Sequence, residues 1–374
     1  MKSIGEFLNL FSLNDIVNRL DIGEPRYSLQ KLGIEGISNK LEQLILEYTD
    51  MKGSLELRKQ IIKYLLEERQ DIISEENILI CSGATGGLYS ALKSVVNCND
   101  KVLVFIPAWP NYFSIIHECG GIIETEEIDL NSEAWHINIE RIKRINRLRA
   151  VVLNVPNNPT GKVPDKKEIR KLFQYCHYAK IYVILDQAYF ELLYETIDKS
   201  DFWLIDDYVI CVRSFSKYYC MPGLRVGYIV SSKDTIQKIC KVQHCYINCI
   251  GTVEQQIALI CMKCKPQFFV DLSHRYCEMI KYAQHLLEEH KRITCVNPVG
   301  GFFVFVHIKG VNAEWFCRYL AEEYSTLVLP GTIFDSKLYE YIRISCVNLE
   351  YFKNGIENII NAVKDLEKVE SGKG

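Results

Sequence analysis

One stretch of the sequence combines a lysine, an arginine and hydroxyl groups, and these residue types can bind and react with a phosphate-bearing aldehyde. The stretch is SFSKYYCMPGLRVGY, residues 214–228. Lys217 follows an apolar run that predicts a buried strand, and its amine can form a Schiff base with the aldehyde. Ser214, Ser216 and Arg225 can bind the phosphate. A solvated loop with a structural arginine is the alternative interpretation of these residues.

A glycine-rich turn offers a second group of anion-binding donors. Residues 78–81 predict an apolar strand, and SGATGG at 82–87 follows it directly. Helical spacing begins at Leu88, so free backbone N–H groups and the positive end of the helix dipole meet at this turn. A tight strand–helix turn that binds nothing is the alternative.

Continuous apolar runs, separated by helical or mixed stretches, predict a parallel sheet that is covered on both faces. Further runs of this kind are Val102–Ile106, Ala150–Val155, Ile181–Leu185 and Val209–Val212. In such a sheet the loops at the carboxyl ends of the strands build the site. Unusual residues follow each of these strands: PAWP at 107–110, NNPTG at 157–161, DQAY at 186–189 and SFSK at 214–217.

The pattern of elements predicts two domains. Helices are expected over 39–48, 55–70 and 166–178, and residues 233–290 are largely helical. The pattern of predicted elements then changes, with strands at 302–308 and 341–345 and helices at 313–324 and 355–366. We expect an N-terminal arm and part of a small domain over 1–47, a large domain over 48–255 and a small α+β domain over 256–374.

Composition narrows the class of protein. The chain has 374 residues and a net charge of −3, so no electrostatic argument favours nucleic acid or an anionic membrane as a partner. No secretory signal is expected at the N-terminus, and no apolar run approaches the ~18 residues of a membrane span. The 15 cysteines are scattered and odd in number, which indicates reduced thiols and a cytoplasmic location. One CxxC, at 261–264, has no second pair, so no metal site is expected.

Together these loops resemble the class I/II aminotransferases, a family of pyridoxal 5′-phosphate (PLP) enzymes with the aspartate aminotransferase fold, fold type I. The matching stretches run from Gly23 to about Ser345, and SFSKYYCMPGLRVGY and NNPTG are the most specific of them. The resemblance implies an α/β fold with a mostly parallel, seven-stranded type of sheet sandwiched by helices, plus a smaller α+β domain. It also implies that residues 48–255 bind PLP as the cofactor.

The resemblance implies catalytic roles for residues at three strand ends. Lys217 looks like the Schiff-base lysine and the proton shuttle. Asp186 would pair with the pyridine nitrogen and keep it protonated, so that the ring acts as an electron sink. Tyr189 and Asn158 would hydrogen-bond the phenolic oxygen. A helix N-cap is the structural alternative for Asp186, and a packed aromatic is the alternative for Tyr189.

Further cofactor contacts are implied by the same resemblance. Trp109 would stack on the ring, while Ala84 and Thr85 would present backbone N–H groups to the phosphate beside Ser214, Ser216 and Arg225. Tyr48 begins a Y-x-x-x-x-G pattern that ends at Gly53. In the family this tyrosine reaches the phosphate of the neighbouring subunit, which implies a homodimer with shared active sites.

Substrate binding is implied at Arg343, Gly23 and Asn158. Arg343 matches the family's arginine for the α-carboxylate, and the Gly23 backbone meets that carboxylate from the other side. The alternating strand places Arg343 on the face opposite Ile342 and Ile344. An interdomain salt bridge is the structural alternative for this arginine.

The activity implied is a PLP-dependent aminotransferase (EC 2.6.1 type) that moves the amino group of an L-amino acid to a 2-oxo acid. A PLP lyase, cyclase or decarboxylase is the second interpretation, because YSTLVLPGTIF and YIRISC resemble branches that include capreomycidine synthase. After Gly23-Glu24-Pro25 the chain also departs from common members in a region that shapes substrate access. A nicotinamide-dependent oxidoreductase is a third interpretation, which Tyr89 disfavours because it stands where that motif needs its third glycine.

Overall fold

A seven-stranded sheet forms the centre of the larger part of the molecule. The computed structural model describes residues 3–34, 37–69, 73–194, 197–264 and 267–371. The strand order is β2-β8-β7-β6-β5-β3-β4, and β8 is the strand that runs antiparallel to its neighbours. The strands are β2 (Ile78–Ser82), β3 (Lys101–Ile106), β4 (Ile122–Glu127), β5 (Leu148–Asn154), β6 (Tyr182–Asp186), β7 (Val209–Ser214) and β8 (Val226–Val230). The predicted fold class, with a mostly parallel sheet between helices, is confirmed.

Helices cover both faces of this sheet. Alternate strand residues enter two separate cores, so that Leu79 and Cys81 lie in one and Ile78 and Ile80 in the other. Burial on both faces explains why the strands read as continuous apolar runs. One face packs on α4 (Gly83–Val95), α5 (Asn111–Glu118) and α8 (Lys233–His244), and the other on α3 (Leu55–Glu68), α6 (Ile139–Lys143), α7 (Lys166–Ala179) and α9 (Thr252–Cys264).

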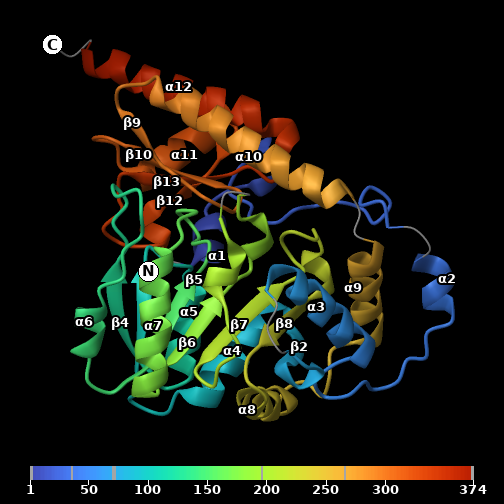
Figure 1. The fold of residues 1–374 in the computed structure, drawn as a ribbon. Helices are drawn as coiled ribbons and strands as arrows, with labels where there is room; N and C mark the ends of the chain where they lie inside the picture. The colour runs from blue at the N-terminus through green and yellow to red at the C-terminus, as the bar shows by residue number, and fades with distance from the viewer. Residues whose placement is uncertain (1–2, 35–36, 70–72, 195–196, 265–266, 372–374) are drawn as a thin grey trace.

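A smaller unit is built on a four-stranded sheet of order β12-β13-β10-β9. In Figure 1 it lies above the large sheet, with α10 and α12 side by side across its top. Its elements are α10 (Gln267–Glu288), β9 (Ile293–Val296), β10 (Phe303–Ile308), α11 (Ala313–Tyr324), β12 (Leu329–Pro330), β13 (Tyr341–Ser345) and α12 (Leu349–Ser371). The N-terminal arm joins this unit, because β1 (Asn18–Arg19) pairs in parallel with β11 (Thr326–Leu327).

The expected change of domain between residues 255 and 256 falls inside α9. This helix contacts α3 and β8, which belong to the larger unit. Gln255 of α9 is buried and accepts a hydrogen bond from the backbone N–H of Ser54 at 2.7 Å. We therefore propose that the larger unit extends to the end of α9 and that the smaller unit resumes with α10.

Two details of secondary structure differ from expectation. The helix predicted over 39–48 is confirmed over 39–42 and wrong beyond it, because α2 covers Ile37–Glu42 and residues 44–50 have no regular structure. Ile45 and Leu46 are 72% and 75% exposed, so the segment lacks the tertiary packing that stabilises a short helix. Strand β4 was missed because its sequence, IIETEE, is acidic, as suits the partly exposed edge of a sheet. Within the described ranges, no helix is both long and apolar enough to cross a membrane.

Candidate active site

The loops that follow the strands meet around a cavity of about 350 Å³ at one edge of the large sheet. Most residues expected at the site line it directly, although they are far apart in sequence. The parallel strands bring them together because their carboxyl ends share one edge of the sheet. The expected lining residues are Ala84, Thr85, Trp109, Asn158, Asp186, Tyr189, Ser214, Ser216, Lys217 and Arg225. Glu24, Asn154, Ala188 and Pro222 complete the lining.

Lys217 extends from the loop after β7 into this cavity. Its Nζ donates a hydrogen bond to the backbone oxygen of Gly23 at 2.5 Å and lies 5.7 Å from the centre of the Tyr189 ring. Burial, reinforced by the positive charge of Arg343, lowers the pKa of Lys217 to about 8, although the Glu24 carboxylate opposes this shift. About a tenth of this amine is therefore neutral, and hence nucleophilic, at pH 7, far more than for an ordinary lysine.

Asp186 is the last residue of β6, and its carboxylate is held in place by two donors. The Tyr112 hydroxyl donates to Oδ2 at 2.5 Å, and the backbone N–H of Ala188 donates to Oδ1 at 3.0 Å. Burial raises the pKa of Asp186, while both hydrogen bonds and the charge of Lys217 lower it. The helix N-cap interpretation does not hold, because the short helix that follows has Tyr189 at its N-cap.

Backbone N–H groups, a guanidinium and hydroxyls line the same cavity. Gly83 begins α4 with φ of +62°, and a Cβ built on it would lie 2.6 Å from Nη2 of Arg225. A side chain at position 83 would therefore displace the arginine. Arg225 donates from Nη1 to Ser216 Oγ at 3.4 Å, and the backbone N–H of Ser216 donates to Ser214 Oγ at 3.0 Å. A helix N-terminus beside an arginine is suited to binding a phosphate.

Asn158, Tyr189 and Trp109 also line this cavity. Asn158 accepts a hydrogen bond from Arg343 Nη1 at its Oδ1, over 3.2 Å. Tyr189 packs edge-on against Phe302 and Phe303, and burial raises the pKa of its hydroxyl, which stays protonated as a donor. The Trp109 ring lies at right angles to the Tyr112 ring with the centroids 5.4 Å apart.

Arg343 lies just behind the cavity as a buried cation. Its Nη2 donates to the backbone oxygen of Asp21 at 2.6 Å, and its guanidinium lies over the Phe303 ring at 4.3 Å. Burial lowers the pKa of Arg343 to about 10. Among the residues that the structure describes, no carboxylate lies within ion-pair distance of it, which argues against the interdomain salt bridge. Its Nε has no partner in the same set of residues.

Tyr48 does not join the cavity of its own chain. Its side chain is 82% exposed, and the residue is absent from the cavity lining. The loop that carries it is held firmly nonetheless, because Gln255 binds Thr49 and Ser54. Gly53 has φ of +94°, and a Cβ there would come within 2.3 Å of Ile80. The glycine of the Y-x-x-x-x-G pattern therefore lets this loop pack against β2.

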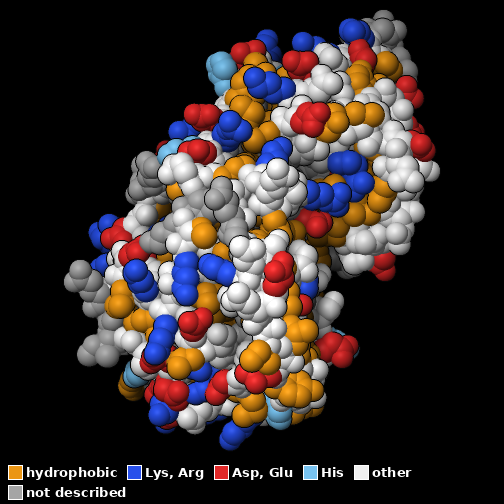
Figure 2. Space-filling model, turned by 90° about the vertical axis from the view of Figure 1, so that its right-hand side faces the viewer, with side chains coloured by type: hydrophobic (Ala, Val, Ile, Leu, Met, Phe, Trp, Pro, Cys, Tyr) orange, Lys and Arg blue, Asp and Glu red, His pale blue; other side chains and the backbone are white. Residues whose placement is uncertain are grey.

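A second cavity of about 380 Å³ adjoins the first, and Glu24 lines both. Glu24 of the N-terminal arm therefore contributes to the lining of both cavities. Figure 2 shows lysine and arginine side chains along the hollow between the two units on this face. The charged residues that line the second cavity are Arg19, Glu24, Arg26, Lys31, Asp271, Arg275 and Glu350.

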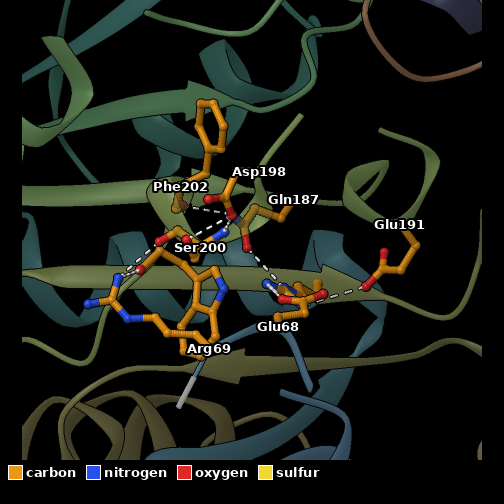
Figure 3. A network of polar contacts seen from close by, with 9 residues as sticks. Glu68, Arg69, Gln187, Glu191, Asp198, Ser200 and Phe202 are labelled. Atoms are coloured by element: carbon orange, nitrogen blue, oxygen red, sulfur yellow. Dashed lines mark hydrogen bonds and ion pairs between the residues drawn. The ribbon is translucent and has the colours of Figure 1, made fainter. Parts of the chain in front are cut away.

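A buried ionic network lies beneath the strand ends (Figure 3). Arg213 of β7 is fully buried and donates to both carboxylate oxygens of Glu68, at 3.1 and 2.8 Å. It also donates from Nε to the side-chain oxygen of Gln187 at 2.9 Å. Gln187 follows Asp186 and Arg213 precedes Ser214, so this bond joins the ends of β6 and β7 where both enter the site. Glu191 is a second buried acid beside Arg213, and burial raises its pKa.

Sequence reasoning missed Asn154 and Tyr112. Asn154 ends β5, four residues before Asn158, and its side chain lines the cavity. Tyr112 lies three residues after Trp109, near the start of α5, and contacts Asp186. The position of Asn154 at the end of a strand was an available signal. Tyr112 gave none, because its contact with β6 depends on how α5 packs.

The chain is similar to known proteins along nearly its whole length. The family model for aminotransferase class I and II matches residues 15–359. An aspartate aminotransferase of Thermotoga maritima is 28% identical over 362 residues, which cover 94% of this chain and 91% of that protein. The (5-formylfuran-3-yl)methyl phosphate transaminase of Methanocaldococcus jannaschii is 29% identical over 351 residues, covering 92% and 90%.

Solved structures show the same similarity at the level of the fold. The crystal structure of the Thermotoga maritima aspartate aminotransferase has a TM-score of 0.85 at 26% identity and covers 93% of this chain and 92% of that chain. An aromatic aminotransferase from Pyrococcus horikoshii shares the fold with a TM-score of 0.86 at 24% identity, covering 98% and 100%. The fold is thus that of the fold type I transferases of the PLP-dependent class. The chain belongs to the class I and II aminotransferase family.

The protein is therefore an aminotransferase, a PLP-dependent enzyme that transfers amino groups between amino acids and 2-oxo acids. This confirms the activity expected from the motifs. The relatives named here are aminotransferases, which does not favour the lyase, cyclase or decarboxylase alternative. The nicotinamide alternative is not favoured either, since the glycine turn at 82–87 lies within the region that matches the family.

Proposed function

We propose that the cavity binds PLP and that the residues around it carry out amino transfer between an amino acid and a 2-oxo acid. The observation that carries the proposal is the placement of the Lys217 amine and the Asp186 carboxylate in one cavity, with a phosphate-binding helix start in its lining. The residues fit this group, because Gly83 leaves room for Arg225 to line the same space. When bound, PLP supplies an aldehyde and an electron-accepting ring.

Different groups of lining residues have different roles in this proposal. The N–H groups of Ala84 and Thr85, with Ser214, Ser216 and Arg225, hold the phosphate. Asp186 would hold the ring nitrogen and favour its protonated form, because a buried carboxylate stabilises a positively charged partner. Trp109 would contact the ring, and Tyr189 and Asn158 would donate to the phenolic oxygen.

With PLP bound, the Lys217 amine would be the group that holds the aldehyde, and it would be placed to accept the Cα proton of the substrate. Its lowered pKa suits both tasks, because the neutral amine attacks and accepts protons. In the structure its Nζ contacts the Gly23 carbonyl. We propose that this contact keeps the amine near the place where the substrate Cα binds.

The experiment that tests the proposal is a half-reaction in the absence of an acceptor. The purified protein, loaded with PLP, is mixed with each of a panel of L-amino acids. Amino transfer predicts that pyridoxamine 5′-phosphate and one equivalent of 2-oxo acid accumulate with at least one of them. Release of ammonia or carbon dioxide instead, with the aldehyde retained, would contradict amino transfer and favour the lyase or decarboxylase.

Arg343 is proposed to bind the α-carboxylate, with Asn158 and the Gly23 backbone beside it. Lysine keeps the charge but loses the planar fork, so Arg343→Lys should weaken amino-acid binding by roughly 2–3 kcal/mol, the scale of charge-assisted hydrogen bonds. Amines that lack a carboxylate should be unaffected. The measurement compares an amino acid with its decarboxylated amine in the half-reaction. Equal losses for both ligands would return Arg343 to a structural role.

We also propose a homodimer in which Tyr48 reaches the phosphate of the neighbouring subunit. The support is the exposed apolar character of this segment, where Ile45, Leu46 and Tyr48 are 72%, 75% and 82% exposed. Large exposed apolar groups that cluster in this way are typical of an interface. In Figure 1 the segment after α2 runs along the outside of the molecule, away from the carboxyl ends of the strands of the large sheet.

Mixing two inactive variants tests this arrangement. Tyr48→Phe and Lys217→Ala damage different parts of a shared site, so a hybrid dimer keeps one intact site. With random exchange of subunits, about a quarter of the wild-type activity should return, because half of the dimers are hybrids and half of their sites are intact. If the subunits exchange and no activity returns, Tyr48 acts within its own chain.

A cytoplasmic location is the remaining proposal. All 15 cysteines are free thiols, as expected in a reducing compartment. Labelling of these thiols in intact cells checks it, since extensive disulfide formation would contradict it.

A further inference from the structure

The side chain of Asn154 links two of the loops that line the cavity. Its Oδ1 accepts a hydrogen bond from the backbone N–H of Asn158 at 2.6 Å. Its Nδ2 donates to the backbone oxygen of Asp186 at 3.0 Å. Asn154 is only 4% exposed, so both polar groups of its amide are used inside the protein. One buried amide thus connects the loop after β5 with the end of β6.

The two bonds differ in how replaceable they are. The Asp186 oxygen also accepts from the backbone N–H of Val155 at 2.9 Å, so it keeps a donor when Asn154 is removed. The Asn158 N–H has Asn154 as its acceptor and is buried. A buried donor without an acceptor is costly, so the loop must move to find one. Loss of the Asn154 side chain should therefore displace Asn158 rather than Asp186.

We propose that Asn154 is a positioning residue that fixes Asn158 relative to Asp186. The inference rests on the proposed function, in which Asn158 donates to the phenolic oxygen of PLP while Asp186 faces the ring nitrogen on the neighbouring strand. The Asn158 side chain also contacts Arg343, so its position bears on both the cofactor and the carboxylate site. No step is assigned to Asn154 itself.

The chain offers a matched control in Asn77. This asparagine is also buried, at 9% exposure, and it also bridges two backbone groups. Its Nδ2 donates to the Ser231 oxygen at 2.9 Å, and its Oδ1 accepts from the Ser74 N–H at 2.9 Å. It precedes β2, at the end of the strand opposite the glycine turn. Asn77→Ala therefore removes the same kind of bridge far from the cavity.

The experiment is a pH titration of the visible absorbance of the PLP-loaded protein, together with its thermal unfolding. A donor on the phenolic oxygen holds down the pKa of the protein–cofactor link, so misplacing Asn158 should raise it. We expect Asn154→Ala to move the titration midpoint upward by about half to one pH unit, the equivalent of one hydrogen bond. Both alanine variants should lower the unfolding temperature, but Asn77→Ala should titrate like the wild type.

The outcomes separate this inference from the proposed function. An unchanged midpoint in Asn154→Ala, or an equal shift in both variants, would overturn the positioning role while amino transfer stands. A wild-type protein that gives no visible band with PLP would overturn the proposed function and this inference with it. If Asn154→Ala does not fold, Asn154→Leu keeps the branched shape of the side chain, removes both bonds and must shift the midpoint in the same direction.

Discussion

Replacing Lys217 with alanine is expected to abolish the covalent link between the protein and PLP. The wild-type protein, treated with borohydride and digested, should yield a pyridoxyl-lysine peptide that contains residue 217. The Lys217→Ala protein should yield none there, because no other lysine lines the cavity within the described ranges. Removal of the Cα proton should also slow by at least about 100- to 10,000-fold, the usual contribution of a positioned base.

A second buried lysine provides the control for this experiment. Lys162 is only 2% exposed and donates to the backbone oxygen of Ser132, and burial lowers its pKa. Lys162→Ala should therefore lose stability yet retain the adduct at Lys217. A pyridoxyl-lysine that persisted at the site in Lys217→Ala, or that disappeared in Lys162→Ala alone, would contradict the assignment.

The lowered pKa of Lys217 adds a pH dependence with a definite sign. Only the neutral amine attacks an aldehyde, and the pKa of this amine in the protein without cofactor is about 8. The rate of covalent attachment of PLP should therefore rise about tenfold per pH unit below 8 and level off above it. Stopped-flow absorbance across this range measures the rate. A plateau that begins only near the ordinary lysine pKa, ~10.4, would show that the amine is not perturbed.

The sequence predicted most of the residues that line the cavity, and the reason lies in the sheet. Lys217, Asp186 and Asn158 each follow an apolar run, and parallel strands place such positions at one edge. The fold class followed from the same runs, because burial on both faces makes a strand continuously apolar.

The features that the sequence did not predict depend on contacts between distant segments. Tyr112 bonds to Asp186 across 74 positions, and its helix gives no local sign of that partner. Asn154 was predicted only as part of the strand over 150–155, although its amide binds Asn158 and Asp186. The segment around Tyr48 was read as helix because local spacing suggested it. The structure leaves its apolar side chains without packing, so nothing stabilises a helix there.

At Asp186, variants can separate the effect of the negative charge from the effect of the side-chain shape. The structure gives it two fixed donors, Tyr112 and the Ala188 N–H, so a replacement disturbs a defined set of contacts. Asparagine keeps the size and one acceptor oxygen but has no charge, whereas alanine removes both. Tyr112→Phe leaves the charge and removes one donor. Because this donor lowers the pKa of Asp186, its loss should raise that pKa further.

Both Asp186→Asn and Asp186→Ala are expected to slow Cα–H cleavage by on the order of a thousandfold or more, which corresponds to ~4 kcal/mol of barrier. The reason is that a neutral residue cannot hold the proton on the ring nitrogen, so the ring loses its capacity to accept electrons. Tyr112→Phe should cost much less, since the carboxylate remains. As a control, Asp201→Ala removes another buried carboxylate, paired with Arg170. It should lower the stability of the protein without slowing Cα–H cleavage.

The measurement is the single-turnover rate with a Cα-deuterated amino acid, which isolates the proton-transfer step. If Asp186→Asn stays within about tenfold of the wild type, ~1.4 kcal/mol, the charge at this position is not what activates the ring, and Asp186 has a structural role.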